Sequence, residues 1–319
     1  MIMKKLYIMF RKGVKFVNWK KLIVRIGFVL LSLIVIVGVT GFYIYHDVVK
    51  TSNTIYHPIE ETEKRDEPLR IKEKDPFSVL LLGVDKRAGD KGRSDSLIVL
   101  TVNPDKHTTK MISIPRDTRT EIVGKNSTDK INHAYAFGGV QMSVNTVEKF
   151  LNIPIDYYIE VNMEGFKDIV DAIGGIKVNN TLDFTNDGVH FTKGPLFLDG
   201  KDALSFSRMR YEDPQGDFGR EARQRQIIEA VINEGTKIES LVGYKDILKS
   251  INKNLVTNFT IKEMFDIQKE YRIASENIEK KQLQGKGTMI KGIYYYQIPE
   301  KNRLMISNEL REQLGLLPM

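Results

Sequence analysis

The sequence contains no cysteine among its 319 residues. This absence excludes disulfide bridges, thiolate zinc sites, covalently attached haem and thiol nucleophiles. Histidine is scarce as well, and the five histidines do not have the spacing typical of a zinc enzyme. With 41% hydrophobic and 28% charged residues, the chain has a globular composition and is long enough for one large domain or two small ones.

Acidic residues are missing from the first 25 positions, which hold eight lysines and arginines. The net charge of the whole chain is +7, so the remainder carries a net charge of −1. A basic surface on a folded domain would favour nucleic acid as a partner, but here the positive charge is confined to one short segment. A segment of this length is too short for a folded DNA-recognition domain, so we predict no nucleic-acid partner.

The basic segment is followed by residues 26–45, a run of 20 residues without a charge. A helix needs about 20 apolar residues to cross the hydrocarbon core, so this run predicts a transmembrane helix. The alternative is a cleaved signal peptide, but its apolar core spans only ~7–15 residues and ends in small residues, whereas Phe42 to Tyr45 are bulky. By the positive-inside rule, residues 1–25 are cytoplasmic and residues 46–319 lie outside the cell membrane of a single-pass protein.

The rest of the chain divides into a stem and a domain. Residues 46–76 contain a charged cluster and little apolar periodicity, which predicts an extended or partly helical stem. From Phe77 onward, short apolar runs typical of strands buried on both faces alternate with helical periodicity. This alternation predicts an α/β fold, a three-layer α/β/α domain with a central mixed sheet over residues 77–319. The expected strands are 77–84, 97–102, 111–114, 157–161 and 294–297, and the expected helical stretches are 130–151, 163–172, 261–271 and 301–314.

Arginine is concentrated between Arg208 and Arg225, where five of the chain's 16 arginines occur and no lysine does. Lysine is twice as frequent as arginine in the whole chain, so this window selects the guanidinium group. A guanidinium binds phosphate or carboxylate oxygens in pairs, which an ammonium group cannot do. The window therefore predicts an anion site, to which Arg208 and Arg210 point together only if their stretch is extended. The alternative is a solvated helix face whose arginines pair with neighbouring acids.

A helix that begins near position 219 would refine this prediction. It would place Arg220 and Gln224 on one face, which continues into an apolar stripe further along the helix. An anion at the start of the helix would also meet free backbone N–H groups and the positive end of the helix dipole. Arg225 lies about 140° round the helix from Arg220, so we expect it to face solvent.

A loop between two expected strands carries Asp85 and Asp95. Carboxylates are hard oxygen ligands, and magnesium is usually held by one or two of them together with substrate phosphates. The pair therefore predicts a magnesium site, with Mg²⁺ as the cofactor. The alternative is that both aspartates cap turns.

Two further blocks, Ile114–Asp117 and Lys130–Tyr135, follow in order. Together with the Asp85 loop and the arginine window, they resemble the LytR–CpsA–Psr family of Gram-positive cell-wall enzymes, in particular its teichoic-acid-transferring members. The resemblance covers about residues 77–234, the short basic end and the single anchor. In that family a polyprenyl pyrophosphate lipid lies in an apolar pocket of an α/β/α domain, with its head group against arginines and magnesium.

The resemblance implies roles for individual residues. It assigns magnesium to Asp85 and Asp95. It assigns the pyrophosphate contacts to Arg93, Arg116, Lys130, Arg208, Arg210, Arg220 and Gln224. The residues implied in catalysis are Asp85, Arg116, Arg208, Arg210, Asp217 and Arg220, with Asp217 orienting arginines or assisting proton transfer. Arg225 stands where family members often have glutamine, and no role is assigned to residues 235–319.

The implied reaction is phosphotransfer without a nucleotide. A hydroxyl of peptidoglycan, the 6-hydroxyl of muramic acid, attacks a lipid-linked pyrophosphate that carries an anionic glycopolymer such as wall teichoic acid, and polyprenyl phosphate leaves. Two alternatives stay open. A polyprenyl-pyrophosphate pyrophosphatase would use water at the same site, and a non-catalytic lipid-binding or regulatory module would need the arginines but not the two aspartates.

Overall fold

The computed structural model describes residues 54–60, 64–65, 67–85, 92–237 and 254–319. The predicted transmembrane helix over residues 26–45 lies outside them. Among the described residues, no helix is both long and apolar enough to cross a membrane. These residues belong to one compact unit, residues 48–319, and Ile55 and Ile71 of the predicted stem are buried in it.

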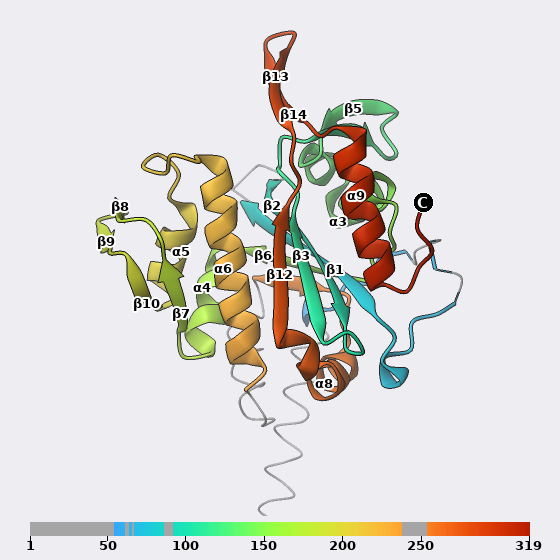
Figure 1. The fold of residues 1–319 in the computed structure, drawn as a ribbon, viewed down its shortest axis with the longest axis horizontal. Coiled ribbons are helices and arrows are strands. Elements are labelled where there is room, and N and C mark those ends of the chain that lie inside the picture. Colours follow the sequence, from blue (N-terminus) through green and yellow to red (C-terminus); the bar gives the residue numbers. More distant parts are fainter. Residues whose placement is uncertain (1–53, 61–63, 66, 86–91, 238–253) are drawn as a thin grey trace, which may run out of the picture. The chain divides into compact units, whose positions relative to one another are not determined.

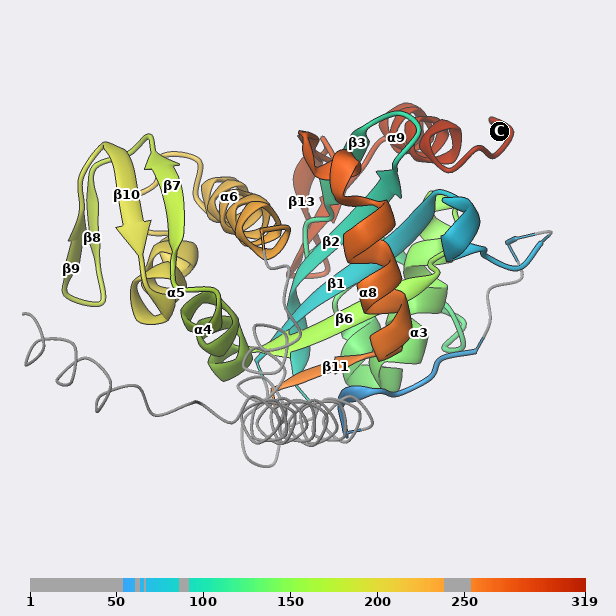
Figure 2. The same cartoon turned by 90° about the horizontal axis from the view of Figure 1, so that it is seen from below.

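Six strands form the central sheet, in the order β11-β6-β1-β2-β3-β12 (Figures 1 and 2). They are β1 (Phe77–Asp85), β2 (Arg93–Asn103), β3 (Thr108–Ser113), β6 (Tyr157–Asn162), β11 (Leu255–Thr257) and β12 (Asn277–Gln282). Strand β1 runs antiparallel to β2 and parallel to β6, and β3 runs parallel to β12. The sheet is therefore mixed, as the sequence predicts.

Helices cover both faces of this sheet, which gives the three layers visible in Figure 2. The described helices of the domain are α3 (His133–Leu151), α4 (Met163–Ala172), α5 (Gly200–Arg208), α6 (Asp217–Gly235), α8 (Ile261–Glu270) and α9 (Glu300–Gln313), with the short 3-10 helices η1 (Ile71–Glu73) and η2 (Arg272–Ser275). Helices α3 and α9 pack on one face, over buried residues such as Leu80 and Val99. Helix α8 and part of α6 pack on the other face, around Phe77 and Met111. Because successive strand residues point to opposite faces, only strands that are apolar at nearly every position can build both cores.

A smaller lobe lies on the outer side of α6 (Figure 1). It contains α4, α5 and two antiparallel strand pairs, β7 (Ile176–Asn180) with β10 (Gly194–Leu198) and β8 (Phe184–Asn186) with β9 (Val189–Phe191). Three aromatic rings, those of Phe184, Phe191 and Phe206, contact one another in its core, which also includes Ile227 of α6. Helix α6 is therefore packed on two sides, by the sheet and by the lobe.

Two hairpins complete the domain. Strand β4 (Arg119–Ile122) pairs with β5 (Ser127–Lys130), and β13 (Lys286–Ile290) pairs with β14 (Ile293–Gln297). The β13-β14 hairpin follows the edge strand β12 in the chain and projects from the domain at the top of Figure 1.

Most of the predicted elements are present, with ends shifted by up to four residues. The stretch 130–151 differs, because Lys130 ends strand β5 and helix α3 begins at His133. Strands β11 and β12 were not predicted. Strand β12 has the sequence Asn-Ile-Glu-Lys-Lys-Gln and lies at the edge of the sheet. Edge strands often carry charged side chains, so this strand lacks the apolar run by which the other strands were predicted.

Candidate functional site

A β-bulge places Asp95 at the end of the β1-β2 pair. The strand register shifts between Gly83 and Val84, so Asp95 is an extra residue on β2. Bulges bend a strand and redirect a side chain, and they are frequent beside active sites. Asp85, the last residue of β1, is opposite Arg93 in the same pair. Both predicted metal ligands therefore lie at the same end of one strand pair.

Arg116 follows β3 and connects Asp95 to α6. Its Nη1 donates a hydrogen bond of 2.6 Å to Asp95 Oδ1, and its Nε is 3.7 Å from Asp217 Oδ2. Burial lowers the pKa of this guanidinium, but the hydrogen bond to Asp95 and the negative charges of Asp217 and Asp95 outweigh burial, so the pKa is raised overall. Arg116 is thus a cation held between the sheet and the start of a helix.

Asp217, the first residue of α6, has three arginines around its carboxylate. Its oxygens are 2.9 Å from Arg220 Nη2, 3.6 Å from Arg210 Nε and 3.7 Å from Arg116 Nε. Three guanidinium groups and Lys130 therefore meet three carboxylates, those of Asp217, Asp95 and Asp117, near the first turn of a helix. The positive end of the helix dipole at this turn favours a bound anion.

Arg220 is the most buried of these three arginines, with 12% of its side chain exposed. Its Nη2 is close to Asp217 Oδ1 but is not aligned as a hydrogen bond, and within the described part of the chain neither Nη2 nor Nε has a hydrogen-bond partner. Burial lowers the pKa of Arg220, although the charge of Asp217 opposes this. Buried N–H groups are nearly always paired, so two unpaired donors on one guanidinium indicate the place of an anionic ligand.

Two more predicted residues lie next to this cluster. Ser96 donates a hydrogen bond of 3.1 Å to Gln224 Oε1, which ties α6 to β2. Lys130 Nζ is 2.6 Å from Asp117 Oδ1, in the residue after Arg116. The structure therefore brings together residues from β2, the exit of β3, the end of β5 and the start of α6.

Two predicted arginines are not brought into these ion pairs. Arg93 and Arg208 are both exposed. Arg208 is the last residue of α5, whereas Arg210 lies beyond the end of that helix. The extended stretch that would align the two side chains is therefore not formed.

The prediction that Arg225 faces solvent is wrong. Only 8% of the residue is exposed, and its Nη1 donates a hydrogen bond of 2.6 Å to Ser113 Oγ at the end of β3. Helix α6 packs against both the sheet and the lobe, so its periodicity does not define a single outer face. One turn earlier, buried Glu221 accepts a hydrogen bond of 2.7 Å from Gln282 Nε2. Burial raises the pKa of Glu221 to about 7, with a further contribution from the charge of Asp217.

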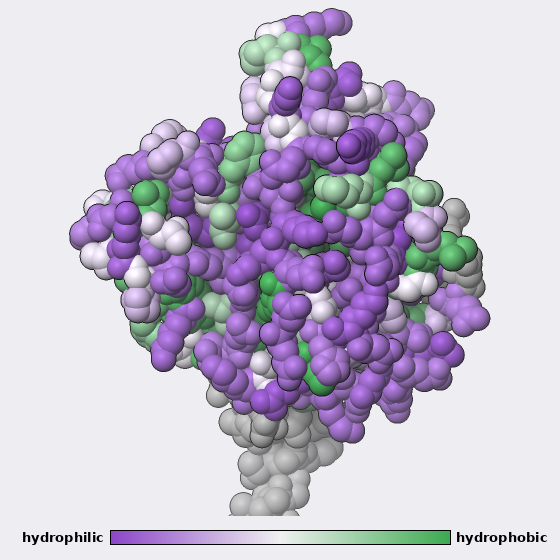
Figure 3. Space-filling model, viewed as in Figure 1, coloured by the Kyte–Doolittle hydropathy of each residue, from purple (hydrophilic) through white to green (hydrophobic). Residues whose placement is uncertain are grey.

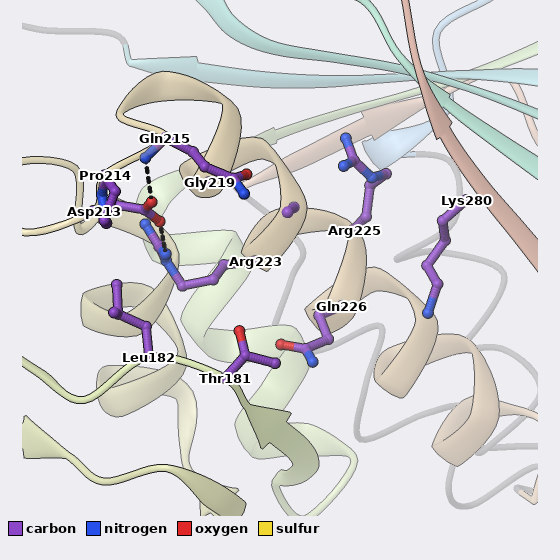
Figure 4. A pocket seen from close by; sticks show the side chains of 11 residues that line it. Thr181, Leu182, Asp213, Pro214, Gln215, Gly219, Arg223, Arg225, Gln226 and Lys280 are labelled. Atoms are coloured by element: carbon purple, nitrogen blue, oxygen red, sulfur yellow. Dashed lines mark hydrogen bonds and ion pairs between the residues drawn. The ribbon is translucent and has the colours of Figure 1, made fainter.

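Arg223 holds the segment before α6 in place (Figure 4). Its guanidinium donates to the backbone carbonyl of Phe206 at 3.1 Å, to that of Met209, and to Asp213 Oδ2 at 2.5 Å. A Cβ on Gly219 would be 1.8 Å from Asp213 Oδ2, so the backbone of α6 can approach this carboxylate only at a glycine. Arg223 therefore positions the loop that carries Arg210. The arginine-rich sequence pattern alone does not distinguish this structural role from anion binding.

A pocket of about 440 Å³ lies beside α6, lined by residues of the lobe, of α6 and of β12 (Figure 4). Its lining includes Thr181, Gln226 and Lys280. Gln226 lies roughly 120° round the helix from Arg220. The pocket is therefore on a different side of α6 from the ion-pair cluster around Asp217.

A metal site made of protein ligands alone is not present among the described residues, which contain no group of three or more histidines, aspartates or glutamates suited to holding a metal. Asp85 and Asp95 are a pair at one end of the β1-β2 strands. Two carboxylates fit a magnesium ion that takes its remaining ligands from phosphate and water. Arg220, whose Nε and Nη2 have no hydrogen-bond partner in the described structure, is a candidate to bind such a phosphate.

The layered fold and this cluster of guanidinium and carboxylate groups define an α/β protein with a charged cluster at one end of its central sheet. The chain belongs to the LytR–CpsA–Psr family, whose model (LytR_cpsA_psr family) matches residues 42–312. It is 51% identical over 292 residues to the polyisoprenyl-teichoic acid–peptidoglycan teichoic acid transferase TagU of Bacillus subtilis, which covers 89% of this chain and 95% of that relative. Identity to the TagU of Bacillus cereus is 55% over 280 residues, covering 87% of this chain and 92% of the relative.

Solved structures agree with this assignment. The crystal structure of B. subtilis TagU is 51% identical, with a TM-score of 0.63, and the match covers 76% of this chain and 97% of that one. A structure of TagT bound to LIIa-WTA is 33% identical, with a TM-score of 0.70, and the match covers 81% and 97% of the two chains. The family and the mixed-sheet α/β domain that the sequence predicts are thereby confirmed.

Proposed function

We propose that this chain is a TagU-like transferase that moves wall teichoic acid from a polyprenyl pyrophosphate lipid to peptidoglycan. The 6-hydroxyl of muramic acid attacks the phosphorus that carries the polymer and loses its proton. The bond from that phosphorus to the bridging oxygen breaks, and polyprenyl phosphate leaves. The 51% identity to B. subtilis TagU, over 89% of this chain, supports teichoic acid as the polymer and peptidoglycan as the acceptor.

The two unpaired donors of Arg220 carry this proposal. Phosphoryl transfer depends on positioning and on neutralising charge on the phosphate oxygens. Arg220 Nε and Nη2 would bind those oxygens, with Arg116 and Arg210 around the same carboxylate. Asp217 lies among three guanidinium groups and holds their orientation, so we assign it a positioning role.

Asp85 and Asp95 would hold a magnesium ion in this site. When bound, the ion supplies Lewis-acid charge to the pyrophosphate oxygens. Asp95 also orients Arg116 through the 2.6 Å hydrogen bond to Nη1. This one carboxylate would therefore couple the metal to the arginine cluster.

The proposed placement is the outer surface of a Gram-positive cell membrane. Residues 1–25 would lie in the cytoplasm and residues 26–45 would form the single span. The eight cations before this uncharged run support that orientation.

The reaction is tested with the full-length protein, a short-chain lipid-linked teichoic acid donor and a peptidoglycan fragment. We expect polymer to become attached to the fragment in a magnesium-dependent reaction, which Asp85→Ala and Asp95→Ala each abolish while the domain still folds. Release of polymer phosphate into water, with none on the fragment, would identify a pyrophosphatase instead. Unchanged magnesium dependence in both variants would mean that the aspartates only cap turns.

A further inference from the structure

The β13-β14 hairpin exposes an apolar surface. Among the exposed large apolar side chains of the described residues, Met289, Ile293 and Tyr294 lie within six positions and are 64%, 50% and 44% exposed. Figure 3 shows apolar residues at this upper end of the molecule, between hydrophilic neighbours. Met289 and Tyr294 are directly opposite each other in the β13-β14 pair and share one face, whereas Ile293 lies on the other face. We call Met289 and Tyr294 the hairpin tip. Exposed apolar groups gathered in one place often mark an interaction site.

The hairpin holds this surface in a defined conformation. Its two-residue turn is Lys291-Gly292, with φ values of 51° and 80°, and positive φ at both positions suits the tight turn that matches the twist of paired strands. The ring of Tyr294 lies against the bare backbone of Gly287, where a Cβ would be 2.7 Å from the tyrosine oxygen and 2.8 Å from Cε2. The glycine thus supports one side of the aromatic ring while the residue stays partly open to solvent.

The base of the hairpin contacts the anion site. The backbone N–H of Tyr296 donates a hydrogen bond of 2.8 Å to the carbonyl of Asp117, which pairs with Lys130. The ring centroid of Tyr296 is 5.4 Å from that of Phe218, the residue after Asp217. Alternate residues of a strand share a face, so Tyr294 lies on the same face of the hairpin as Tyr296, the face that leads to the start of α6. The hairpin tip is therefore an outward continuation of the arginine cluster.

The hairpin carries charge of one sign only. Between Leu283 and Pro299 there are two lysines, Lys286 and Lys291, and no acidic residue. The face of an aromatic ring suits a ligand with an apolar face, as a sugar ring has. Lysines attract carboxylates over several ångströms. A strand of N-acetylated sugars with carboxylate-bearing peptides offers both kinds of group.

We propose that the hairpin tip binds the glycan strand of the peptidoglycan acceptor. This inference rests on the proposed transfer reaction and names the surface that would hold its acceptor. The tip would keep a glycan strand beside the site while one of its hydroxyls reaches the phosphate bound by the arginines.

Two other occupants are less consistent with the structure. A teichoic acid chain carries phosphates, which would use the lysines but not the apolar tip. A membrane surface would have to meet the hairpin at the β12 edge of the sheet, whereas the chain enters the domain at the opposite edge, where Tyr56 bridges to Thr257 of β11.

Binding can be measured without the transfer reaction, by co-sedimentation of the full-length protein with wall sacculi stripped of teichoic acid. We expect Tyr294→Ala to weaken binding about tenfold, or ~1.4 kcal/mol, and Tyr294→Phe to retain it. Met289→Ala should weaken binding severalfold. Met305→Ala is the matched control, because Met305 is 54% exposed on α9, and its replacement should leave binding unchanged. All four variants should keep the wild-type Tm, since these side chains are at the surface.

Kinetics give an independent measurement. In the transfer assay, Tyr294→Ala should raise KM for the peptidoglycan fragment about tenfold and leave KM for the lipid-linked donor unchanged. Unchanged sacculus binding would overturn the proposal. A rise in the donor KM alone would overturn it in favour of the teichoic acid chain. Wild-type protein that binds sacculi but transfers nothing would refute the transferase and leave the docking surface in place.

Discussion

Replacing Arg220 by lysine separates a phosphate clamp from a simple positive charge. Lysine keeps the charge, but one ammonium group cannot reproduce Nε and Nη2, the two guanidinium donors that lack hydrogen-bond partners in the described structure, although Nη2 forms an ion pair with Asp217. A hydrogen bond between charged groups contributes ~1.5–3 kcal/mol. Since ~1.4 kcal/mol corresponds to a tenfold change in rate, the loss of one such bond should slow transfer by roughly 10- to 150-fold.

The assay is single-turnover transfer from a short-chain donor, with thermal unfolding measured in parallel. Arg303→Lys is the matched control, because Arg303 donates to Glu300 and to the carbonyl of Phe150 on the α3-α9 side of the sheet. This control should lower the Tm slightly and leave the rate within about twofold of wild type. Arg225→Lys is unsuitable as a control, because that side chain is buried against Ser113. A near-wild-type rate for Arg220→Lys, at unchanged Tm, would refute the clamp.

Two further predictions concern pH and topology. The folded chain keeps the proton of Glu221 up to about pH 7, whereas the unfolded chain releases it near 4.5, so the free energy of unfolding should fall by on the order of 3 kcal/mol as pH rises between these values. Glu221→Gln should remove this loss and raise the Tm at about pH 8 but not at about pH 4, and an equal effect at both would contradict the raised pKa. Protease added to intact protoplasts should digest residues 46–319, and protection of that region would contradict its placement outside the cell.

Local sequence patterns were sufficient for the layered α/β fold, and they predict the kind of site without testing it. Strands apolar on both faces, such as β1, can be recognised because burial on two sides leaves no polar positions. The use of arginine in a lysine-rich chain predicts an anion site that includes Arg220, whereas Arg116 and Asp217 are implied only by the resemblance to the family, and the structure places the three in one set of ion pairs. These inferences concern residue type and short-range periodicity, which the chain carries locally.

Packing between distant segments decided the rest. Arg225 is buried because the sheet and the lobe both pack against α6. Helical periodicity shows which residues of a helix share a face, but not how many of its faces other elements cover. Arg208 is an exposed residue at the end of α5, outside the ion pairs of Arg116, Arg210 and Arg220, because the helix extends to that position. The β13-β14 hairpin reaches the site only because Tyr296 meets Asp117 and Phe218, which lie far away in sequence. Contacts of this kind depend on how helices and strands pack in three dimensions, and no local pattern records them.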